Sequence, residues 1–266
     1  MPYSRANGVD IWYEVSGDGP AMVLVHANPF DHNLWMYQIA HFSTWFKVVG
    51  IDIRGYGRSA KVLEPYTQAD MCNDVIGVMK YLGIRRAVLG GCSVGSGNAI
   101  QLGLDHPELF DALILVGGNA GSSDRYHSRI EGYTTDLAAY HPKHMRLLVE
   151  KSFSESKLGN YLLGTFAERG PRLKGEAIAN VFRAGNGTDN TARLPTMKVP
   201  TLVINGEFDN SMKAGKRTAS LVPGAVHKVL PGANHACCLE DPAVFDQLVI
   251  EFLTARDLMP KLAPAP

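Results

Sequence analysis

The chain has 266 residues, of which 45% are hydrophobic and 20% are charged, the proportions of a soluble globular protein. Lys and Arg number 26, and Asp and Glu also number 26, so the formal net charge is zero. A chain without a basic excess is not expected to bind nucleic acid, and a small neutral or weakly charged molecule suits this balance best. No apolar run approaches the roughly 20 residues that span a bilayer, and the N-terminus lacks the apolar segment of a signal peptide. We therefore expect no membrane partner and a cytoplasmic location.

The chain carries four cysteines, whose spacing matches no zinc-binding pattern. Four are also too few for a disulfide framework in a chain of this length. We expect free, buried thiols at all four positions and no metal site. The four are Cys72, Cys92, Cys237 and Cys238.

The first half of the chain alternates strand patterns with helical patterns. Short apolar runs predict strands at 9–15, 21–26, 46–53, 86–92 and 112–117. Helical spacing of apolar residues predicts helices at 33–42, 67–82 and 94–106, and Gly83 is a typical helix stop. This alternation predicts an α/β fold with a mostly parallel sheet that is covered by helices on both faces.

Strand patterns stop near residue 120 and resume only at Pro200. The stretch between them holds helical patterns broken by glycine and proline, and a structureless loop of that length is uncommon. We therefore predict a mostly helical cap at 120–196. Strands at 201–205 and 226–230 and helices at 212–221 and 244–254 then complete the sheet domain. The expected organisation is one discontinuous domain, residues 1–119 and 197–260, with the cap inserted in it and a disordered tail at 261–266.

The sharpest chemical signal is Gly91-Cys92-Ser93-Val94-Gly95, which lies between a predicted strand and a predicted helix. A Gly-x-Ser-x-Gly sequence is a weak pattern alone, but at a strand-to-helix junction it predicts a tight turn that lifts the serine above the sheet. The N–H groups of the helix N-terminus favour negative charge at that point. The pattern predicts Ser93 as a nucleophile.

A serine hydroxyl needs a base, and the base needs an orienting acid. His235 follows the last predicted strand, at the end of a parallel sheet where ligands bind. Asp209 follows the strand at 201–205 and is the preferred acid, because it lies further along the loop than its rival Glu207 and is shorter. The order Ser, Asp, His is the one expected for this kind of fold. Three histidines of the predicted cap are instead expected at the surface: His127, His141 and His144.

An oxyanion on the substrate needs backbone donors. The N–H of Val94, directly after the nucleophile, is the first predicted donor. The second should come from the loop that begins at His26, where Pro29 cannot donate. We choose Asn28 for it, and Ala27 is the alternative.

Two aromatic residues, Phe30 and Trp35, follow that loop closely. Both are candidates for lining an apolar acyl pocket, and ordinary core packing is the alternative. In the segment from Asp52 to Ser59, arginine and glycine fit a tight loop after a strand. We expect Asp52 to make loop hydrogen bonds rather than to act in catalysis.

Together these segments resemble the α/β-hydrolase superfamily, specifically its capped esterases, lactonases and cofactor-free peroxidase-like members. The resemblance covers nearly the whole chain and implies an eight-stranded sheet with a cap between strands six and seven. Ala27 departs from the family, which usually has glycine there. A serine at position 93 disfavours haloalkane dehalogenases and epoxide hydrolases, whose nucleophile is aspartate. The segments that carry the resemblance are His26–Pro29, Asp52–Ser59, Gly91–Gly95, Gly206–Asp209 and Gly232–His235.

The expected function is therefore that of a serine hydrolase that cleaves a small to medium, largely apolar carboxylic ester or lactone through an acyl-enzyme on Ser93. This chemistry needs no metal and no organic cofactor. Hydrolysis of a C–C bond in a diketone is the alternative among enzymes. A non-catalytic small-molecule receptor of the same fold is the alternative from another class. The sequence indicates neither the specific substrate nor the oligomeric state.

Overall fold

The computed structural model describes residues 2–5, 7–121 and 126–261, so the predicted tail lies outside the described residues except for Lys261. Within them the strands form one eight-stranded sheet in the order β1-β2-β4-β3-β5-β6-β7-β8. β1 pairs with β2, and β2 with β4, in antiparallel fashion, and every other pairing is parallel. The predicted α/β fold with a mostly parallel sheet is confirmed. The strands are β1 Tyr3–Ser4, β2 Ile11–Ser16, β3 Ala21–Val25, β4 Lys47–Ile51, β5 Ala87–Cys92, β6 Phe110–Val116, β7 Thr201–Gly206 and β8 Val226–Leu230.

The edge strand β1 is the one strand that the apolar pattern did not predict. It has only two residues, too few to show an alternation, and it exists because Tyr3 pairs with Trp12 and Ser4 with Ile11. The other strands lie where the pattern predicted them, with small shifts at their ends.

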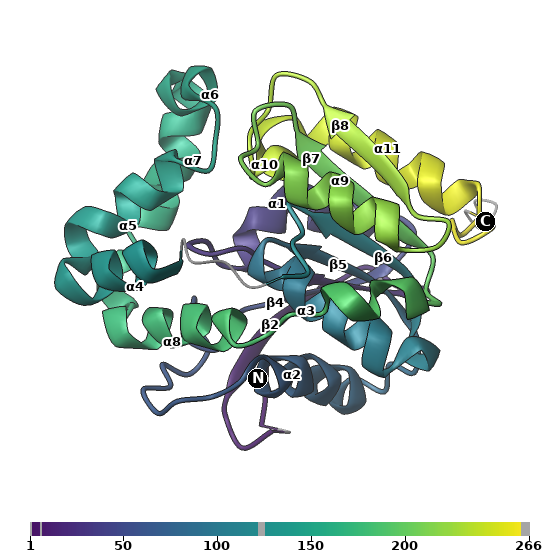
Figure 1. The fold of residues 1–266 in the computed structure, drawn as a ribbon, viewed down its shortest axis with the longest axis horizontal. Helices are drawn as coiled ribbons and strands as arrows, with labels where there is room; N and C mark the ends of the chain where they lie inside the picture. Colours follow the sequence, from purple (N-terminus) through teal and green to yellow (C-terminus); the bar gives the residue numbers. More distant parts are fainter. Residues whose placement is uncertain (1, 6, 122–125, 262–266) are drawn as a thin grey trace.

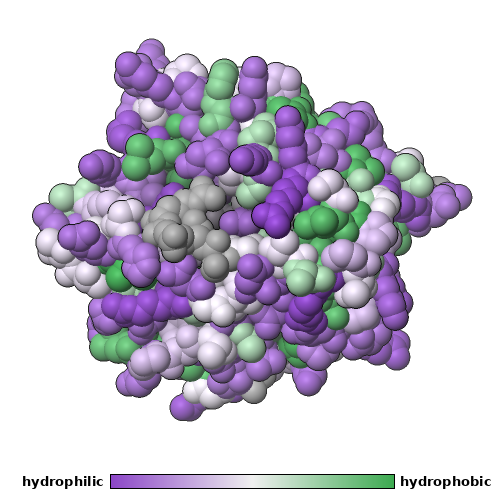
Figure 2. All heavy atoms as spheres, in the orientation of Figure 1, coloured by the Kyte–Doolittle hydropathy of each residue, from purple (hydrophilic) through white to green (hydrophobic). Residues whose placement is uncertain are grey.

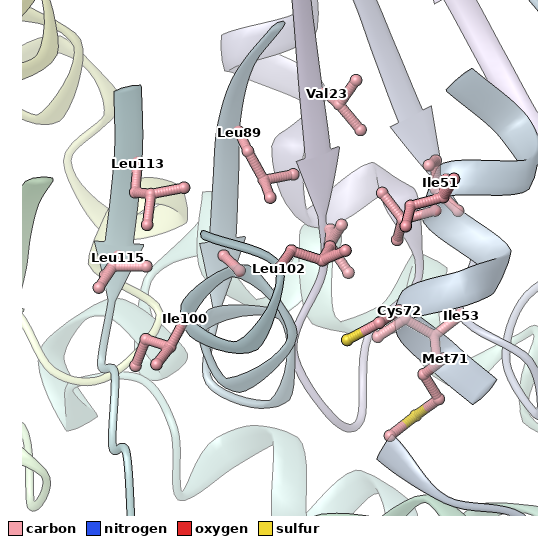
Figure 3. Close-up of a cluster of buried hydrophobic side chains, with 14 of the residues drawn as sticks. Val23, Ile51, Ile53, Met71, Cys72, Leu89, Ile100, Leu102, Leu113 and Leu115 are labelled. Carbon is pink, nitrogen blue, oxygen red and sulfur yellow. The ribbon is translucent and has the colours of Figure 1, made fainter. Parts of the chain in front are cut away.

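Helices cover both faces of the sheet, as Figure 1 shows. The side chains of β3 alternate between two apolar clusters, because neighbouring residues of a strand point to opposite faces. Val23 belongs to the cluster that includes α2 and α3, and Leu24 to the cluster that includes α1 and α11. In Figure 3, Leu89 and Leu113 of the sheet lie beside Leu102 of α3. The core helices are α1 Met36–Phe42, α2 Gln68–Tyr81, α3 Val94–Asp105, α9 Met212–Leu221, α10 Cys237–Glu240 and α11 Pro242–Thr254.

Helix α2 shows how local sequence sets an element's ends. The side chain of Thr67 accepts a hydrogen bond from the Asp70 N–H, and the Asp70 carboxylate accepts one from the Thr67 N–H, which is a capping box. Gly83 follows the helix with a φ of +68°, a conformation in which glycine is favoured at a helix end. The predicted boundaries of this helix are therefore confirmed.

Among the described residues, five α-helices lie between β6 and β7, in the chain segment where a cap was predicted. In Figure 1 they form a group to one side of the sheet, and α8 runs back toward α2. Helices α4 and α8 pack through aromatic rings, with Tyr133 stacked on Phe182 at a centroid distance of 5.9 Å. We call these five the inserted helices: α4 Tyr126–Thr135, α5 Leu137–Arg146, α6 Lys151–Glu155, α7 Lys157–Ala167 and α8 Gly175–Asn186.

On the face shown in Figure 2, hydrophobic residues are scattered among hydrophilic ones, as is normal for a protein surface. Among the helices of the described residues, none combines the length and the apolar character needed to cross a membrane.

Candidate active site

Ser93 lies in the sharp turn between β5 and α3. Its backbone has φ 54° and ψ −109°, a conformation that is rare for a residue with a side chain and that stores strain. The flanking glycines make the turn possible. A Cβ on Gly91 would lie 2.2 Å from the carbonyl oxygen of Gly95, and a Cβ on Gly95 would lie 2.2 Å from that of Val25. The tight turn expected from the Gly-x-Ser-x-Gly sequence is therefore present.

His235 and Asp209 form a hydrogen-bonded pair at the ends of β8 and β7. The His235 Nδ1 lies 2.9 Å from the Asp209 Oδ1. The Asp209 carboxylate also accepts bonds from the backbone N–H of Ser211 at 2.8 Å, from its hydroxyl at 2.8 Å, and from the Asn205 amide at 2.9 Å. Glu207 lies elsewhere, since its exposed carboxylate accepts from the Gly232 N–H at 2.9 Å. The structure thus pairs His235 with the predicted Asp209 and not with its rival.

The environment keeps Asp209 ionised. Burial alone would raise the pKa of this carboxyl group, but the charge of protonated His235 and the hydrogen bonds from His235, Ser211 and Asn205 outweigh burial and lower it far below its ordinary value. A carboxylate that accepts at Nδ1 holds the Nδ1 proton in place and leaves Nε2 of the imidazole able to take a proton. Sequence reasoning missed Asn205 and Ser211, although both flank Asp209 closely in the chain.

Ser93 lines a cavity, and His235 lies against a glycine of the same lining. Gly117, at the end of β6, lines this cavity together with Ser93. A Cβ on Gly117 would lie 2.4 Å from the Cε1 of His235, so the imidazole ring lies directly against this glycine. Ser93 itself is half-buried and thus reachable from the cavity.

The cavity lies between the sheet domain and residues 120–196, which contain the inserted helices and are called the inserted segment below. The core contributes apolar contacts from Val94 and Ile100 and an amide from Gln68. The segment after β6 contributes Asn119 and Tyr126, and Thr188 and Asn190 follow α8. The described lining therefore combines apolar surface with uncharged hydrogen-bonding groups. Sequence reasoning did not identify Gln68 or Asn190 as site residues, because each is far from Ser93 in the chain.

The loop after β3, which was predicted to supply an oxyanion donor, is held tightly by the core. His26 donates from Nδ1 to the Ala27 carbonyl at 2.9 Å and accepts from the Ile53 N–H at Nε2, at 3.0 Å. Burial lowers the pKa of His26, so its ring is neutral and both nitrogens have one partner. The loop closes with a bond of 2.9 Å from the Phe30 N–H to the Ala27 carbonyl.

Asn28 is buried in this loop, before a cis peptide bond to Pro29. Its side-chain oxygen accepts no hydrogen bond from the described residues. The start of α3 packs against this loop, since a Cβ on Gly95 would lie 2.9 Å from the His26 carbonyl oxygen. The two predicted donors, Asn28 and Val94, are therefore on adjacent segments.

Phe30 and Trp35 are both buried in the core cluster of the α1 and α11 face. The Phe30 ring meets Phe166 of α7 edge to face at 5.0 Å, and the Trp35 ring lies 6.0 Å from Phe245. Neither is among the described residues that line the Ser93 cavity. These contacts favour the core-packing alternative over the predicted acyl pocket, because each ring is packed against other side chains of the protein.

The Asp52–Ser59 segment is structural, as expected. The Asp52 carboxylate accepts from the backbone N–H of His32 at 2.8 Å and from that of Arg58 at 2.7 Å, and the His32 Nδ1 lies 2.7 Å from it. Asp31, His32 and Asp52 place potential metal-ligand atoms within 4.8 Å of one another. Their carboxylates are already occupied by hydrogen bonds, with Asp31 accepting from Asn33 at 2.9 Å and from Arg169 at 2.6 Å. The cluster therefore braces the loop.

The expectation for the histidines of the inserted segment was partly wrong. His127 is exposed, but His141 and His144 are buried. The His144 Nδ1 lies 2.7 Å from the Tyr133 hydroxyl, and its Nε2 contacts Arg129. His141 donates from Nε2 to the Pro29 carbonyl at 3.0 Å. Both were misassigned because their burial is created by chain segments that the helical pattern cannot identify.

Comparison with known proteins agrees with this architecture. A family model described as the alpha/beta hydrolase fold matches residues 20–242. The 3-oxoadipate enol-lactonase 1 of Acinetobacter baylyi is 26% identical, with 94% of this chain and 95% of that protein covered. The carboxylesterase YbfK of Bacillus subtilis is 25% identical, with 89% and 81% covered.

A solved structure of the enol-lactonase from Burkholderia xenovorans superposes with a TM-score of 0.89 at 27% identity, covering 95% of this chain and all of that one. The family-model match at residues 20–242 includes the turn at Ser93 and the loops that carry Asp209 and His235. The chain belongs to the α/β-hydrolase family, whose members include esterases and lactonases.

Proposed function

We propose that the protein is a serine hydrolase that cleaves a carboxylic ester or lactone through an acyl-enzyme on Ser93. One observation carries the proposal: His235, hydrogen-bonded to Asp209, lies against Gly117, which lines the same cavity as the strained Ser93. A nucleophile, a base and an orienting acid are the three groups that acyl transfer through serine needs. The similarity to an enol-lactonase and a carboxylesterase supports the same class of reaction.

In the proposed first step, the Ser93 hydroxyl attacks the substrate carbonyl while Nε2 of His235 takes its proton. The carbonyl oxygen becomes an oxyanion, which the N–H groups of Val94 and Asn28 stabilise. The tetrahedral intermediate collapses, the C–O bond to the alcohol breaks, and His235 returns the proton to the leaving alkoxide. In the second step His235 takes a proton from water, the hydroxide attacks the acyl-enzyme, and Ser93 leaves with that proton while the acid is released.

The inserted segment, residues 120–196, is proposed as a cap over this site. Ala120, Tyr126 and Asn190 already form part of the cavity wall. Because an enclosing cap limits the size of the ligand, we propose a small to medium substrate. The apolar part of the lining suits a largely apolar body, and the amides of Gln68 and Asn119 suit a few neutral polar groups near the scissile carbonyl.

A fluorophosphonate probe tests the proposal directly. We expect the purified protein to gain the mass of one phosphonyl group on the peptide that contains Ser93, and to hydrolyse members of a panel of nitrophenyl esters and lactones. Ser93→Ala should abolish both the label and the turnover. Ser220→Ala, in which an exposed serine of α9 is removed, is the matched control and should retain both.

The same assays, with vinylogous diketones added to the panel, separate this proposal from a C–C bond hydrolase and from a non-catalytic receptor. Turnover that persists unchanged in Ser93→Ala refutes the proposal. Turnover of vinylogous diketones without ester hydrolysis favours a C–C bond hydrolase. Thermal stabilisation by a panel compound without any turnover, and without labelling of Ser93, favours a receptor.

A further inference from the structure

Three consecutive residues after Asn28 each contact the inserted segment. The Pro29 carbonyl accepts a hydrogen bond from the His141 Nε2 of α5 at 3.0 Å. The Phe30 ring packs edge to face on Phe166 of α7 at 5.0 Å. The Asp31 carboxylate accepts from Arg169, which follows α7, at 2.6 Å. The loop thus has a binding partner in the inserted segment at every residue from 29 to 31.

The core holds the other end of the same loop. His26 bridges the Ala27 carbonyl and the Ile53 N–H with its two ring nitrogens, and its ring meets Tyr56 at 5.4 Å. Asn28 therefore lies between a part of the loop that the core holds and a part that the inserted helices hold. The bonds to the Ala27 carbonyl hold the peptide unit that carries the Asn28 N–H, and the bond to the Pro29 carbonyl holds the chain on the other side of Asn28.

Of the two polar contacts from the inserted segment, the bond from His141 is the more buried and its acceptor is the nearer to Asn28 in the chain. His141 is 3% exposed, so solvent does not replace its bond to the Pro29 carbonyl. Burial lowers the pKa of His141, which keeps the ring neutral, and its single proton lies on the Nε2 that donates. Arg169 is 39% exposed, so its ion pair with Asp31 should contribute less.

We propose that His141 is a positioning residue for the oxyanion hole, and that the inserted helices complete this hole by holding the Asn28 N–H in its stabilising orientation. This inference rests on the proposed function. It assigns to the inserted segment a role in the chemical step, in addition to enclosing the substrate. A donor held by two independent segments needs no reorganisation when the oxyanion forms, which is the condition under which such donors contribute most.

Removal of the His141 donor should therefore slow the chemical step more than it weakens substrate binding. In His141→Leu we expect kcat on a good ester substrate to fall about 10- to 100-fold, while KM changes less than about threefold, because displacement of a catalytic group by roughly an ångström costs up to about 100-fold. His141→Gln places an amide N–H near the position of Nε2–H and should recover most of the lost kcat. Arg169→Met should lower kcat in the same direction by a smaller factor.

An inhibitor pair gives a readout that general loss of stability would not change. A trifluoromethyl ketone forms a hemiketal oxyanion on serine, whereas the matching secondary alcohol fills the pocket without one. The inhibition constant of the ketone should rise in His141→Leu by the same factor as kcat/KM falls, and that of the alcohol should stay constant. Arg146→Met is the matched control on α5, since the bonds of this arginine within the described part of the chain go to Ser154 and Asn160 of the inserted segment. It should leave kcat and both inhibition constants within about twofold of wild type.

Hydrogen exchange of the peptide that covers residues 27–32 completes the test. It should be faster in His141→Leu than in wild type and restored in His141→Gln. An unchanged kcat in His141→Leu, an effect on KM alone, or equal weakening of the ketone and the alcohol would overturn the inference while the proposed function stands. If wild-type protein is not labelled at Ser93 and hydrolyses no ester or lactone, the proposed function is refuted, and this inference is refuted with it.

Discussion

Replacement of Asp209 by asparagine tests the proposed site at its most constrained point. Four donor groups converge on the two carboxylate oxygens: the His235 Nδ1, the Asn205 amide, and the Ser211 backbone N–H and hydroxyl. An amide offers one acceptor oxygen in place of two, so in either orientation its NH₂ group faces a donor. If the NH₂ replaces Oδ1, it opposes the backbone N–H of Ser211, which cannot rotate away, and the His235 Nδ1.

The expected loss is large, because the substitution removes a charge as well as an acceptor. In the well-studied serine hydrolase triad, the same change lowers kcat by about 10⁴ and leaves the geometry intact. A factor of that size corresponds to about 5.4 kcal/mol of transition-state stabilisation. The convergence of donors around Asp209 leads us to expect a loss of about 10³- to 10⁴-fold in kcat for Asp209→Asn.

The assay is steady-state hydrolysis of a nitrophenyl ester, with circular dichroism to establish that the variant is folded. Glu207→Gln is the matched control, because this carboxylate lies two residues away in the same loop but is exposed and, among the described residues, accepts from the Gly232 N–H alone. It should retain activity within about twofold. A folded Asp209→Asn that keeps more than a tenth of wild-type kcat, or a Glu207→Gln that loses more than Asp209→Asn, would refute the reasoning.

Three further predictions concern stability, each measured by urea unfolding. The Arg54 guanidinium donates to the Asp74 carboxylate at 2.6 and 2.7 Å, and both side chains are 5% exposed. Asp74→Ala leaves the Arg54 charge buried and unpaired, so it should lower the free energy of unfolding by about 3–5 kcal/mol, and a loss below about 1 kcal/mol would contradict this. Gly95→Ala should lower the free energy of unfolding by more than about 3 kcal/mol, because its Cβ would lie 2.2 Å from the Val25 carbonyl oxygen. Gly164→Ala in α7, whose Cβ would have nothing within 4 Å, should raise the free energy of unfolding by up to about 1 kcal/mol. Equal effects of the two substitutions would refute the steric argument. Burial would raise the pKa of Asp52, but the hydrogen bond and charge of His32 lower this pKa from 3.8 to about 2. The ionised Asp52 carboxylate therefore contributes about 2 kcal/mol to stability above about pH 4, and this contribution is lost as the pH falls toward about 2. The difference in unfolding free energy between wild type and Asp52→Asn should shrink over that range, and a difference that grows on acidification would contradict the assignment.

Features that depend on neighbouring residues could be predicted from the sequence. The turn at Ser93 is an example, because two flanking glycines and a strand-to-helix change of pattern are sufficient to specify it. The helix predicted at 67–82 is another, since its apolar spacing and its stop at Gly83 are local signals. The mostly parallel sheet followed from the alternation of strands and helices, as did the position of the inserted helices between β6 and β7.

Features that depend on which segments meet in space could not be predicted in this way. The sequence placed both Glu207 and Asp209 in the loop after β7, and a choice between them required the bonds from Asn205 and Ser211 that hold Asp209 toward His235. Phe30 had a pocket and a core interpretation, and its contact with Phe166 of α7 favours the core.

His141 is the clearest example of this difference between local and tertiary features. By itself the sequence determined that this histidine lies in a mostly helical insertion, because helical periodicity is a property of consecutive residues. Its burial against Pro29, on which its proposed role depends, was decided only when the tertiary structure brought α5 onto the loop after β3. Periodicity defines which residues share a face of a helix, but only the packing of distant segments defines what that face contacts.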